Sequence, residues 1–561
     1  MSLQDYADSA GKLPTSLAQT GDSAEVASPA QVSGEKEATP SAGSLSAGSP
    51  SAGSPSAGSP SAGSVDITSI DRKKMERDRL ARQVEKRRLA SSSATSSPAR
   101  SEGPQAKRAR TELGSSTSGG DYPRYPHGTI KKTWAFGKPR DGNDINLDEV
   151  LQTPHLKQLV LSTWQFDTEW WARKFDWIRG PRQLWIIGAR DEATRESFAR
   201  GQEDTNMLKV CFTPMEGGVN MNHSKFMILS YTDHVRFVVT TANMTRYDWG
   251  DTGVMENTVF LIDLPRRPDA DPPQKLTPFG KELVYYLTYV GVPEPLIDSL
   301  GKFDFSNTKH IALVHSLGGA HTGSNLQRTG FPGLARAVRT LNLQTSRPVH
   351  LDYATSSIGA LRKELLMQIC RAASGLEEDA PVKFDDEVST DGLLDHFRVY
   401  YPTKETVSNA IGGTASAGTI TFDRKYWDMP SFPKKAMRDY KSTRHGLLSH
   451  NKIMLARGRQ DEEDNQVGDS NVAWAYVGSA NLTESAWGRL NKDRKTKTVK
   501  LTCRNYECGV LVGVPREQVN KDYHPDEGPG FQVFDGIIDL PFEVPGATYT
   551  HTGMNFPWFG R

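Results

Sequence analysis

The sequence predicts an α/β protein of two similar halves, related by pseudo-twofold symmetry and preceded by a disordered N-terminal tail. Apolar strand-like runs alternate with helical patterns from about residue 126 onward, which is typical of layered α/β folds. One block of polar residues occurs twice, more than two hundred residues apart. A period of that length indicates a duplicated domain, because solenoid repeats are much shorter.

We expect residues 1–125 to be disordered, because they contain almost no aromatic side chains and cannot offset their ordering entropy by burial. Tandem Ser-Ala-Gly-Ser-Pro pentads across residues 41–65 indicate a linker. The mixed-charge stretch 71–88 is compatible with a solvated helix, and short basic clusters there and at residues 107–110 are typical of nuclear import signals or nucleic-acid patches. The tail therefore predicts a nuclear protein.

The ordered part is expected to form an N-terminal half, residues 126–347, and a C-terminal half, residues 348–561, divided at Pro348. An acidic loop, residues 461–469, is expected to lengthen the second half. The expected strands are Leu184–Ile187, Phe226–Leu229, Val235–Val239, Ile311–Val314, Ile453–Leu455, Ala473–Val477 and Val510–Val512. The expected helices are Pro278–Tyr289, Gly333–Leu343 and Gly359–Ala373.

The duplicated block reads Ala-Asn-x-Thr-x-x-x-Trp-Gly in both copies, with a His-x-Lys sequence upstream. Asn257 and Glu507 each follow the block and stand eight residues before a proline. The first copy contains His223, Lys225, Ala242, Asn243, Thr245, Trp249 and Gly250, and the second contains His450, Lys452, Ala480, Asn481, Thr483, Trp487 and Gly488.

This pattern fits attack on a phosphodiester. His-x-Lys on a strand would direct both side chains to one face. An imidazole can act as nucleophile or as general acid and base, while lysine and asparagine side chains stabilise charge on phosphate oxygens. Two halves related by a twofold axis would place one imidazole on each side of the phosphorus. The alternative is a pair of similar structural edges. His155 and Lys157 also match His-x-Lys, but without the second block we interpret them as structural.

Other features limit the class of protein. No run of 18 apolar residues and no apolar leader are visible, so we expect no membrane association and no secretion. Four cysteines are too few for a disulfide framework, which favours reduced thiols in an intracellular protein. No spacing typical of metal ligands occurs, so we expect neither a metal nor another cofactor. We also expect the protein to be a monomer.

The motifs resemble the phospholipase D superfamily, whose pattern is His-x-Lys, four residues and then Asp. Ser230 and Arg457 stand at the two Asp positions. The sequence is therefore similar to the branch typified by tyrosyl-DNA phosphodiesterase, which keeps only His, Lys and Asn. The resemblance covers roughly residues 130–561, and it extends to residues 356–359, 479–488, 505–510 and 545–558.

The resemblance implies two phospholipase D-like α-β-α sandwich halves. It implies that His223 is a nucleophile forming a phosphohistidine and that His450 is the general acid and then the base. Asn257, or its neighbour Glu256, and Glu507 would orient the two imidazoles. The residues implied to hold the phosphate are Lys225, Lys452, Asn243 and Asn481. Those implied to contact DNA are Ser356, Ser357, Gly359, Ala360 and Thr483, although Ser357 equally fits a helix N-cap.

The implied substrate is the 3′ end of single- or double-stranded DNA carrying a tyrosyl or peptide adduct, typically from a trapped type I topoisomerase. The implied process is DNA repair, with other repair proteins contacting the tail. Two alternatives stay open, which are another hydrolase of the superfamily acting on nucleic acid or phospholipid, and a non-catalytic DNA-binding scaffold.

Two lysines in place of a metal-ligand cluster lead to the first prediction. Cleavage of a 3′-phosphotyrosyl oligonucleotide should be unchanged in excess EDTA, because the ammonium groups supply the positive charge at the phosphate. Loss of activity in EDTA that magnesium restores would contradict the two-histidine chemistry.

Overall fold

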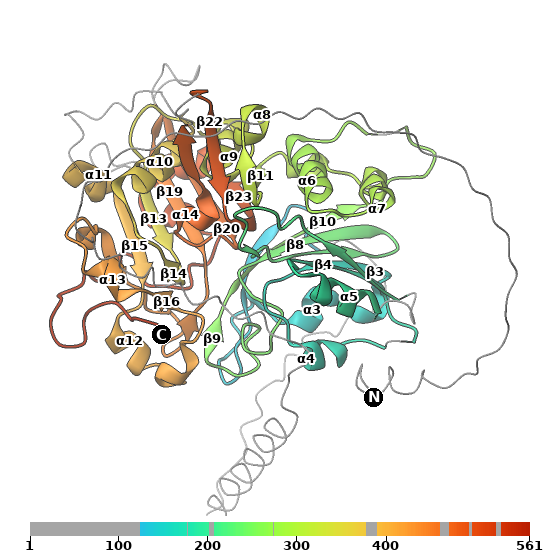
Figure 1. The fold of residues 1–561 in the computed structure, drawn as a ribbon, viewed down its shortest axis with the longest axis horizontal. Helices are drawn as coiled ribbons and strands as arrows, with labels where there is room; N and C mark the ends of the chain where they lie inside the picture. The colour runs from blue at the N-terminus through green and yellow to red at the C-terminus, as the bar shows by residue number, and fades with distance from the viewer. Residues whose placement is uncertain are drawn as a thin grey trace, which may run out of the picture. The chain divides into compact units, whose positions relative to one another are not determined.

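Two β-sheets with the same strand order organise the protein in a computed structural model (Figure 1). The structure describes residues 124–560 except 177, 201–206, 273, 377–389, 461–469, 493–495 and 523–528. The predicted tail of residues 1–123, with its pentads and basic clusters, and the predicted loop 461–469 lie outside the described residues.

The first sheet is formed by segments between residues 129 and 265. Its strands, in spatial order, are β2 (Asp144–Ile145), β1 (Thr129–Thr133), β10 (Thr258–Pro265), β8 (His234–Thr240), β7 (Phe226–Ser230), β3 (Gln158–Ser162), β4 (Arg182–Ile187) and β5 (Leu208–Phe212). The second sheet consists of β11 (Ile311–Ser316), β23 (Asn505–Gly513), β20 (Ser470–Gly478), β19 (Ile453–Gln460), β13 (His350–Ala354), β15 (Phe397–Tyr401) and β17 (Met437–Asp439), with β6 (Met221–Asn222) added beside β23.

The two sheets correspond strand for strand. From β1 through β10, β8 and β7 to β3 the pairings are antiparallel, and those of β3 with β4 and β4 with β5 are parallel. From β11 through β23, β20 and β19 to β13 they are again antiparallel, followed by parallel β15 and β17. This correspondence confirms the predicted duplication.

The division between the halves differs from the predicted one at residues 347 and 348. β11 and helix α9 (Gly330–Thr340) precede Pro348, yet β11 pairs with β23 and α9 packs in the core of the second sheet. Pro348 lies in the loop between α9 and β13, and it therefore marks a local loop within the second half and not the boundary between the halves. By strand pairing, the second half begins with β11.

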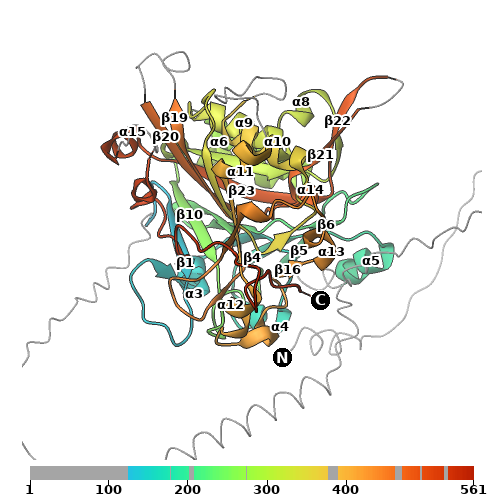
Figure 2. The same ribbon diagram turned by 90° about the vertical axis from the view of Figure 1, so that its left-hand side faces the viewer.

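Helices and side-chain alternation form the layers. Along β7, Phe226 and Ile228 join a core containing residues of both sheets, while Met227 and Leu229 face an outer core with α3 (Leu147–Leu151) and α4 (Thr168–Ala172). On the second sheet, α9 and α10 (Lys363–Ala373) cover the outer face, and α6 (Pro278–Tyr289) contributes to the shared core. Figure 2 shows α9 and α10 with the C-terminal sheet and α3 with the N-terminal one.

The remaining elements are short connections. The helices are α5 (Glu192–Arg200), α7 (Glu294–Asp298), α8 (Gly323–Leu326), α11 (Thr390–His396), α12 (Lys404–Ser408), α13 (Arg424–Trp427), α14 (Glu484–Trp487) and α15 (Arg516–Val519). The strands are β9 (Met255–Glu256), β12 (Gly319–His321), β14 (Ser357–Ile358), β16 (Thr421–Phe422), β18 (Leu448–Ser449), β21 (Arg489–Lys492) and β22 (Val499–Cys503). Within the described ranges, no helix is both long and apolar enough to cross a membrane.

Glycines end both duplicated blocks for a conformational reason. Gly250 and Gly488 have φ values of 81° and 92°, in the left-handed region that side chains disfavour. A Cβ atom at Gly250 would lie 1.7 Å from the backbone oxygen of Trp134. The preceding Trp249 and Trp487 are buried in the cores, so the Trp-Gly pair anchors each block and turns the chain.

The first described residues belong to the first half, although the sequence placed its start at residue 126. The backbone N–H groups of Arg124 and Tyr125 donate to Asp263, which also binds the buried Arg236 through two hydrogen bonds. The Tyr125 ring lies 5.1 Å from the Arg236 guanidinium. The segment therefore shields a buried ion pair.

These contacts lead to a prediction for two fragments. If the full chain cleaves 3′-phosphotyrosyl DNA and accumulates in the nucleus, as the sequence predicts, a fragment of residues 120–561 should keep the first property and lose the second. A fragment of residues 129–561 should be less stable by about 1–3 kcal/mol, because Asp263 loses two charge-assisted hydrogen bonds. Thermal melts of both fragments would check this, and equal melting temperatures would contradict it.

Candidate active site

Short strands exchanged between the halves hold the two His-x-Lys sequences. β6 pairs in parallel with the start of β23, and β18 pairs in parallel with β9. The N–H of His223 donates to the oxygen of Tyr506 at 3.0 Å, and that of His450 donates to the oxygen of Glu256 at 3.1 Å. Each histidine is thus fixed by the backbone of the opposite half.

This arrangement corrects one expectation. Neither His-x-Lys lies within a strand, because each occupies the extended link between a short exchanged strand and a long strand of its own sheet. The links run from β6 to β7 and from β18 to β19. Each histidine therefore lies between a short strand that pairs with the opposite half and a long strand of its own sheet.

Glu507 contacts the first imidazole, as predicted. Its Oε2 lies 2.8 Å from Nδ1 of His223, and the hydroxyl of Ser479 donates to the same oxygen at 2.5 Å. Asn505 donates to the other carboxylate oxygen at 3.0 Å. Because a carboxylate can only accept, Nδ1 carries the hydrogen and Nε2 keeps its lone pair.

Asp248 faces the second imidazole, where the sequence predicted Asn257 or Glu256. Its Oδ2 lies 3.4 Å from Nδ1 of His450, which is a contact and not a hydrogen bond. Glu256 instead forms an ion pair with Arg444 at 2.8 Å. The carboxylate next to the His450 ring is therefore that of Asp248 and not that of Glu256.

Asn257 still occupies the position equivalent to Glu507. Thr241 donates to the Asn257 side-chain oxygen at 2.7 Å, just as Ser479 donates to Glu507. The amide of Asn257 donates to the backbone oxygen of Asp248 at 2.9 Å. Asn257 thus positions Asp248, which in turn faces His450.

Both lysines are buried beside the histidines. Nζ of Lys225 donates to the backbone oxygen of His223 at 2.8 Å, and Nζ of Lys452 donates to that of His450 at 2.6 Å. Burial lowers the pKa of Lys225 to about 8, against the opposing charges of Glu507 and Asp248. Burial and the charge of Lys225 lower the pKa of Lys452 well below its ordinary value. A site that buries two cations whose charges affect each other favours a bound anion.

The imidazoles respond to the same environment. Burial lowers the pKa of His223 to about 4, with Glu507 opposing and Lys225 adding to the effect. Burial and then Lys452 lower the pKa of His450 to about 4 as well. Both rings are therefore neutral near pH 7 in the protein without bound anion.

Hydrogen bonds orient the side chains of both asparagines. Asn481 Oδ1 accepts from the hydroxyls of Thr355 and Ser356 and from the N–H of Ser357, at 3.1 to 3.2 Å. Its amide nitrogen consequently points away from these donors. Asn243 accepts from the N–H of Gln165 at 3.3 Å and donates to Asp248 at 2.8 Å.

The structure brings most of the residues expected to contact DNA together around Asn481. Ser356 and Ser357 bond it directly, and Gly359 donates its N–H to Leu482 beside Thr483. Thr483 caps α14, whereas the cap of α10 is Arg362, so the reading of Ser357 as a helix cap was wrong. Ala360 follows Gly359 and is partly exposed. Contact with DNA stays a prediction for this group.

Sequence reasoning missed several groups that the structure adds to the site. Asp248 stands inside the first block, where the second has Ala486. A carboxylate just before a buried Trp-Gly pair was the signal that could have identified it. Thr241 and Ser479 directly precede the Ala-Asn of each block, and both position the group that follows.

Duplicated α/β halves that bring two His-x-Lys sequences and two asparagines together are the architecture of phospholipase D-type phosphodiesterases. A family model described as tyrosyl-DNA phosphodiesterase matches residues 129–550. The chain belongs to the tyrosyl-DNA phosphodiesterase family.

Named relatives agree with this assignment. The chain is 27% identical over 370 residues to tyrosyl-DNA phosphodiesterase 1 of Arabidopsis thaliana, a match covering 63% of this chain and 56% of that relative. It is 24% identical over 423 residues to the Drosophila melanogaster protein of the same name, covering 72% and 67%. The crystal structure of the yeast tyrosyl-DNA phosphodiesterase has the same fold, with a TM-score of 0.53 at 19% identity, over 75% of this chain and 97% of that one.

The lowered lysine pKa leads to a pH prediction. Lys225 is charged below its pKa of about 8 and loses its charge as the pH rises through that value. Since kcat/KM reports groups of the free enzyme, kcat/KM for a 3′-phosphotyrosyl oligonucleotide should fall above about pH 8. Because the pKa of Lys452 is lowered as well, the limb should disappear from any residual activity only when both lysines are replaced, as Lys225→Arg and Lys452→Arg, whose guanidinium groups stay charged. A wild-type profile that stays flat until exposed lysines titrate would contradict the prediction.

Proposed function

We propose that the protein hydrolyses 3′-phosphotyrosyl bonds and related 3′ adducts of DNA through a covalent phosphohistidine. The observation that carries the proposal is the crossed pairing of His223 with Glu507 and His450 with Asp248 beside two buried lysines. Membership of the tyrosyl-DNA phosphodiesterase family supports the substrate class.

In the first step, Nε2 of His223 attacks the phosphorus and a P–N bond forms. The bond from phosphorus to the tyrosyl oxygen breaks, and this oxygen receives a proton from His450 or leaves as a phenolate. Lys225, Lys452 and Asn481 stabilise the charge on the remaining phosphate oxygens. The DNA is then attached to the enzyme through His223.

In the second step, water attacks the phosphorus and the P–N bond breaks. His450 accepts a proton from the water, and the nitrogen of His223 regains its lone pair. The products are DNA with a 3′ phosphate and free tyrosine or peptide. The same imidazole thus serves as acid and then as base.

The unequal carboxylate contacts support this division of roles. The hydrogen bond of His223 to Glu507 fixes one tautomer, as a nucleophile needs. The wider separation of His450 from Asp248 leaves its protonation free to change during the cycle. A phosphate anion between the lysines would raise the pKa of His450 and favour its acid form.

The setting of the reaction is also a proposal. We place it in the nucleus, on the basis of the basic clusters in the tail, and propose that a monomer acts on single- or double-stranded 3′ ends. The tail would then contact other repair proteins. Ser356, Ser357, Gly359, Ala360 and Thr483 would hold the DNA strand.

The two histidines lead to a prediction in which their variants behave differently. His223→Ala should form no covalent species and show almost no turnover. His450→Ala should still lose tyrosine, because a phenol of pKa about 10 departs without full protonation, but it lacks the base for hydrolysis. An adduct that survives SDS and breaks down in acid should therefore accumulate in His450→Ala.

Electrophoresis of each variant with labelled 3′-phosphotyrosyl DNA would measure the adduct. A separate assay of the wild-type protein with phosphatidylcholine would test for lipid hydrolysis. An adduct in His223→Ala and none in His450→Ala would reverse the roles. No adduct in either variant would favour direct attack by water.

A further inference from the structure

The loop after β3 holds the first asparagine in place. The hydroxyl of Thr163 donates to the oxygen of Gln165 at 2.9 Å and accepts from the N–H of Met244 at 3.1 Å. The N–H of Gln165 donates to Asn243, and Phe166 forms a parallel bridge with Met244. The loop therefore packs directly on the Ala-Asn-x-Thr block.

The loop after β13 repeats this arrangement. Thr355 donates to the oxygen of Ser357 at 2.9 Å and accepts from the N–H of Leu482 at 3.2 Å. Ser357 donates to Asn481, and Ile358 forms a parallel bridge with Leu482. The hydrogen bonds show a further duplicated element, in which Thr163 corresponds to Thr355 and Trp164 corresponds to Ser356.

The two loops differ most at this last position. Ser356 is 1% exposed, whereas Trp164 is 38% exposed. The Trp164 ring centroid lies 5.7 Å from that of His223, with an angle of 54° between the ring planes. The Trp164 ring therefore lies beside His223, whereas the buried Ser356 occupies the equivalent position in the second half.

A series of contacts connects the loop that carries Trp164 to His450. Gln165 bonds Asn243, Asn243 bonds Asp248, and Asp248 faces His450. His450 is the acid that protonates the leaving oxygen in the proposed reaction. The half whose loop carries Trp164 therefore also supplies the carboxylate that faces His450.

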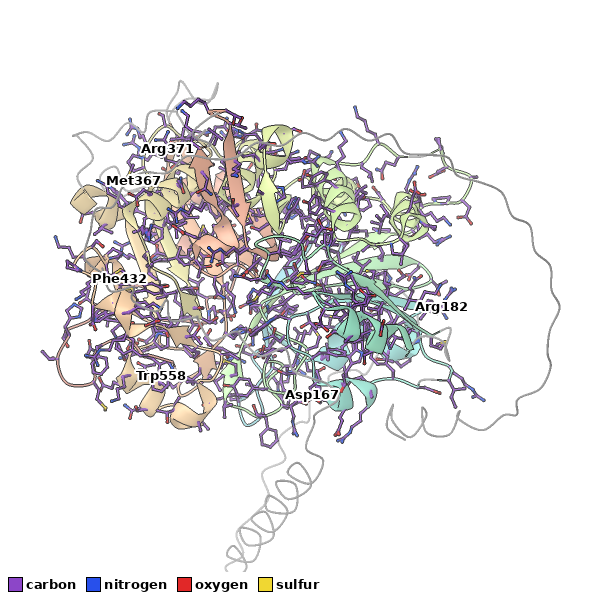
Figure 3. The ribbon with its side chains drawn as sticks, viewed as in Figure 1. Asp167, Arg182, Met367, Arg371, Phe432 and Trp558 are labelled. Atoms are coloured by element: carbon purple, nitrogen blue, oxygen red, sulfur yellow. The ribbon has the colours of Figure 1, made fainter. Side chains whose placement is uncertain are left out.

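The loops around the two asparagines also differ in charge. Residues 163–174 and 245–251 contain four acidic and three basic side chains, whereas the equivalent residues 355–366 and 483–489 contain two acidic and three basic ones. Asp251 follows the first Trp-Gly, and Arg489 follows the second. A DNA strand favours the basic flank. In Figure 3, Asp167 lies with the N-terminal half, and Phe432 and Trp558 lie with the other.

We infer that Trp164 stacks on the aromatic ring of the tyrosyl leaving group and gives the site a preference for aryl over aliphatic 3′ adducts. The inference rests on the proposed function and names a specificity residue for it. Offset stacking between two rings is an efficient contact for a partly exposed tryptophan. Trp164 makes an otherwise symmetric phosphodiester site directional.

The test compares one oligonucleotide carrying either a 3′-phosphotyrosyl or a 3′-phosphoglycolate group. Trp164→Ala should lower kcat/KM for the tyrosyl substrate on the order of tenfold and leave that for the glycolate substrate within about twofold, as expected for an adduct without a ring to stack. Trp164→Phe should keep most of the tyrosyl activity, and Trp164→Leu, which keeps apolar bulk, should not. Phe136→Ala, which removes another exposed aromatic ring, is the matched control and should change neither rate.

Several outcomes would overturn the inference. An equal loss for both substrates in Trp164→Ala would mean that the ring contacts the nucleoside or only supports His223. No loss for either, or activity in Trp164→Leu equal to that in Trp164→Phe, would also overturn it. Failure of the wild-type protein to cleave the tyrosyl substrate would instead refute the proposed function.

Discussion

The exchange of two short strands between the halves is the constraint on which the site depends. β6 of the first half pairs with β23, and β18 of the second half pairs with β9. Each pairing ends at a histidine, so the imidazole reaches a carboxylate of the opposite half. Neither half contains a histidine together with its own carboxylate. The chemistry therefore requires both sheets to be folded and docked, and the shared core between them becomes part of the catalytic apparatus.

The buried charges show what this docking has to overcome. Placing Lys225 and Lys452 out of water costs free energy that two carboxylates and two backbone oxygens offset only in part. The surrounding sheets hold the groups in place, since no local element would keep them together. The lowered pKa values of both lysines record this cost, and an anionic substrate relieves it. Binding energy and catalytic charge stabilisation thus have the same source.

Much of the fold and site was predictable because duplication amplifies weak signals. His-x-Lys is common, but two copies in register with Ala-Asn-x-Thr identified the histidines, lysines and asparagines that the structure brings together. Glu507 was predictable because its position repeats. Asp248 was missed because Ala486 stands opposite it, and the Thr163 loop was missed because hydrogen bonds are conserved between the halves where side chains are not. The boundary at Pro348 failed because the pairing of β11 with β23 joins residues far apart in the chain, which a local turn signal cannot reveal.

The exchanged pairing also bears on how such a chain can arise. Two identical chains that paired their short strands in this way would form one site on the axis of a symmetric dimer. In that dimer every substitution would occur twice, on both sides of the phosphate. Joining the copies into one polypeptide allows each to change alone. Asp248 opposite Ala486 and Trp164 opposite Ser356 are differences that only a fused descendant can carry singly, and through them a substrate with two unlike ends can be distinguished.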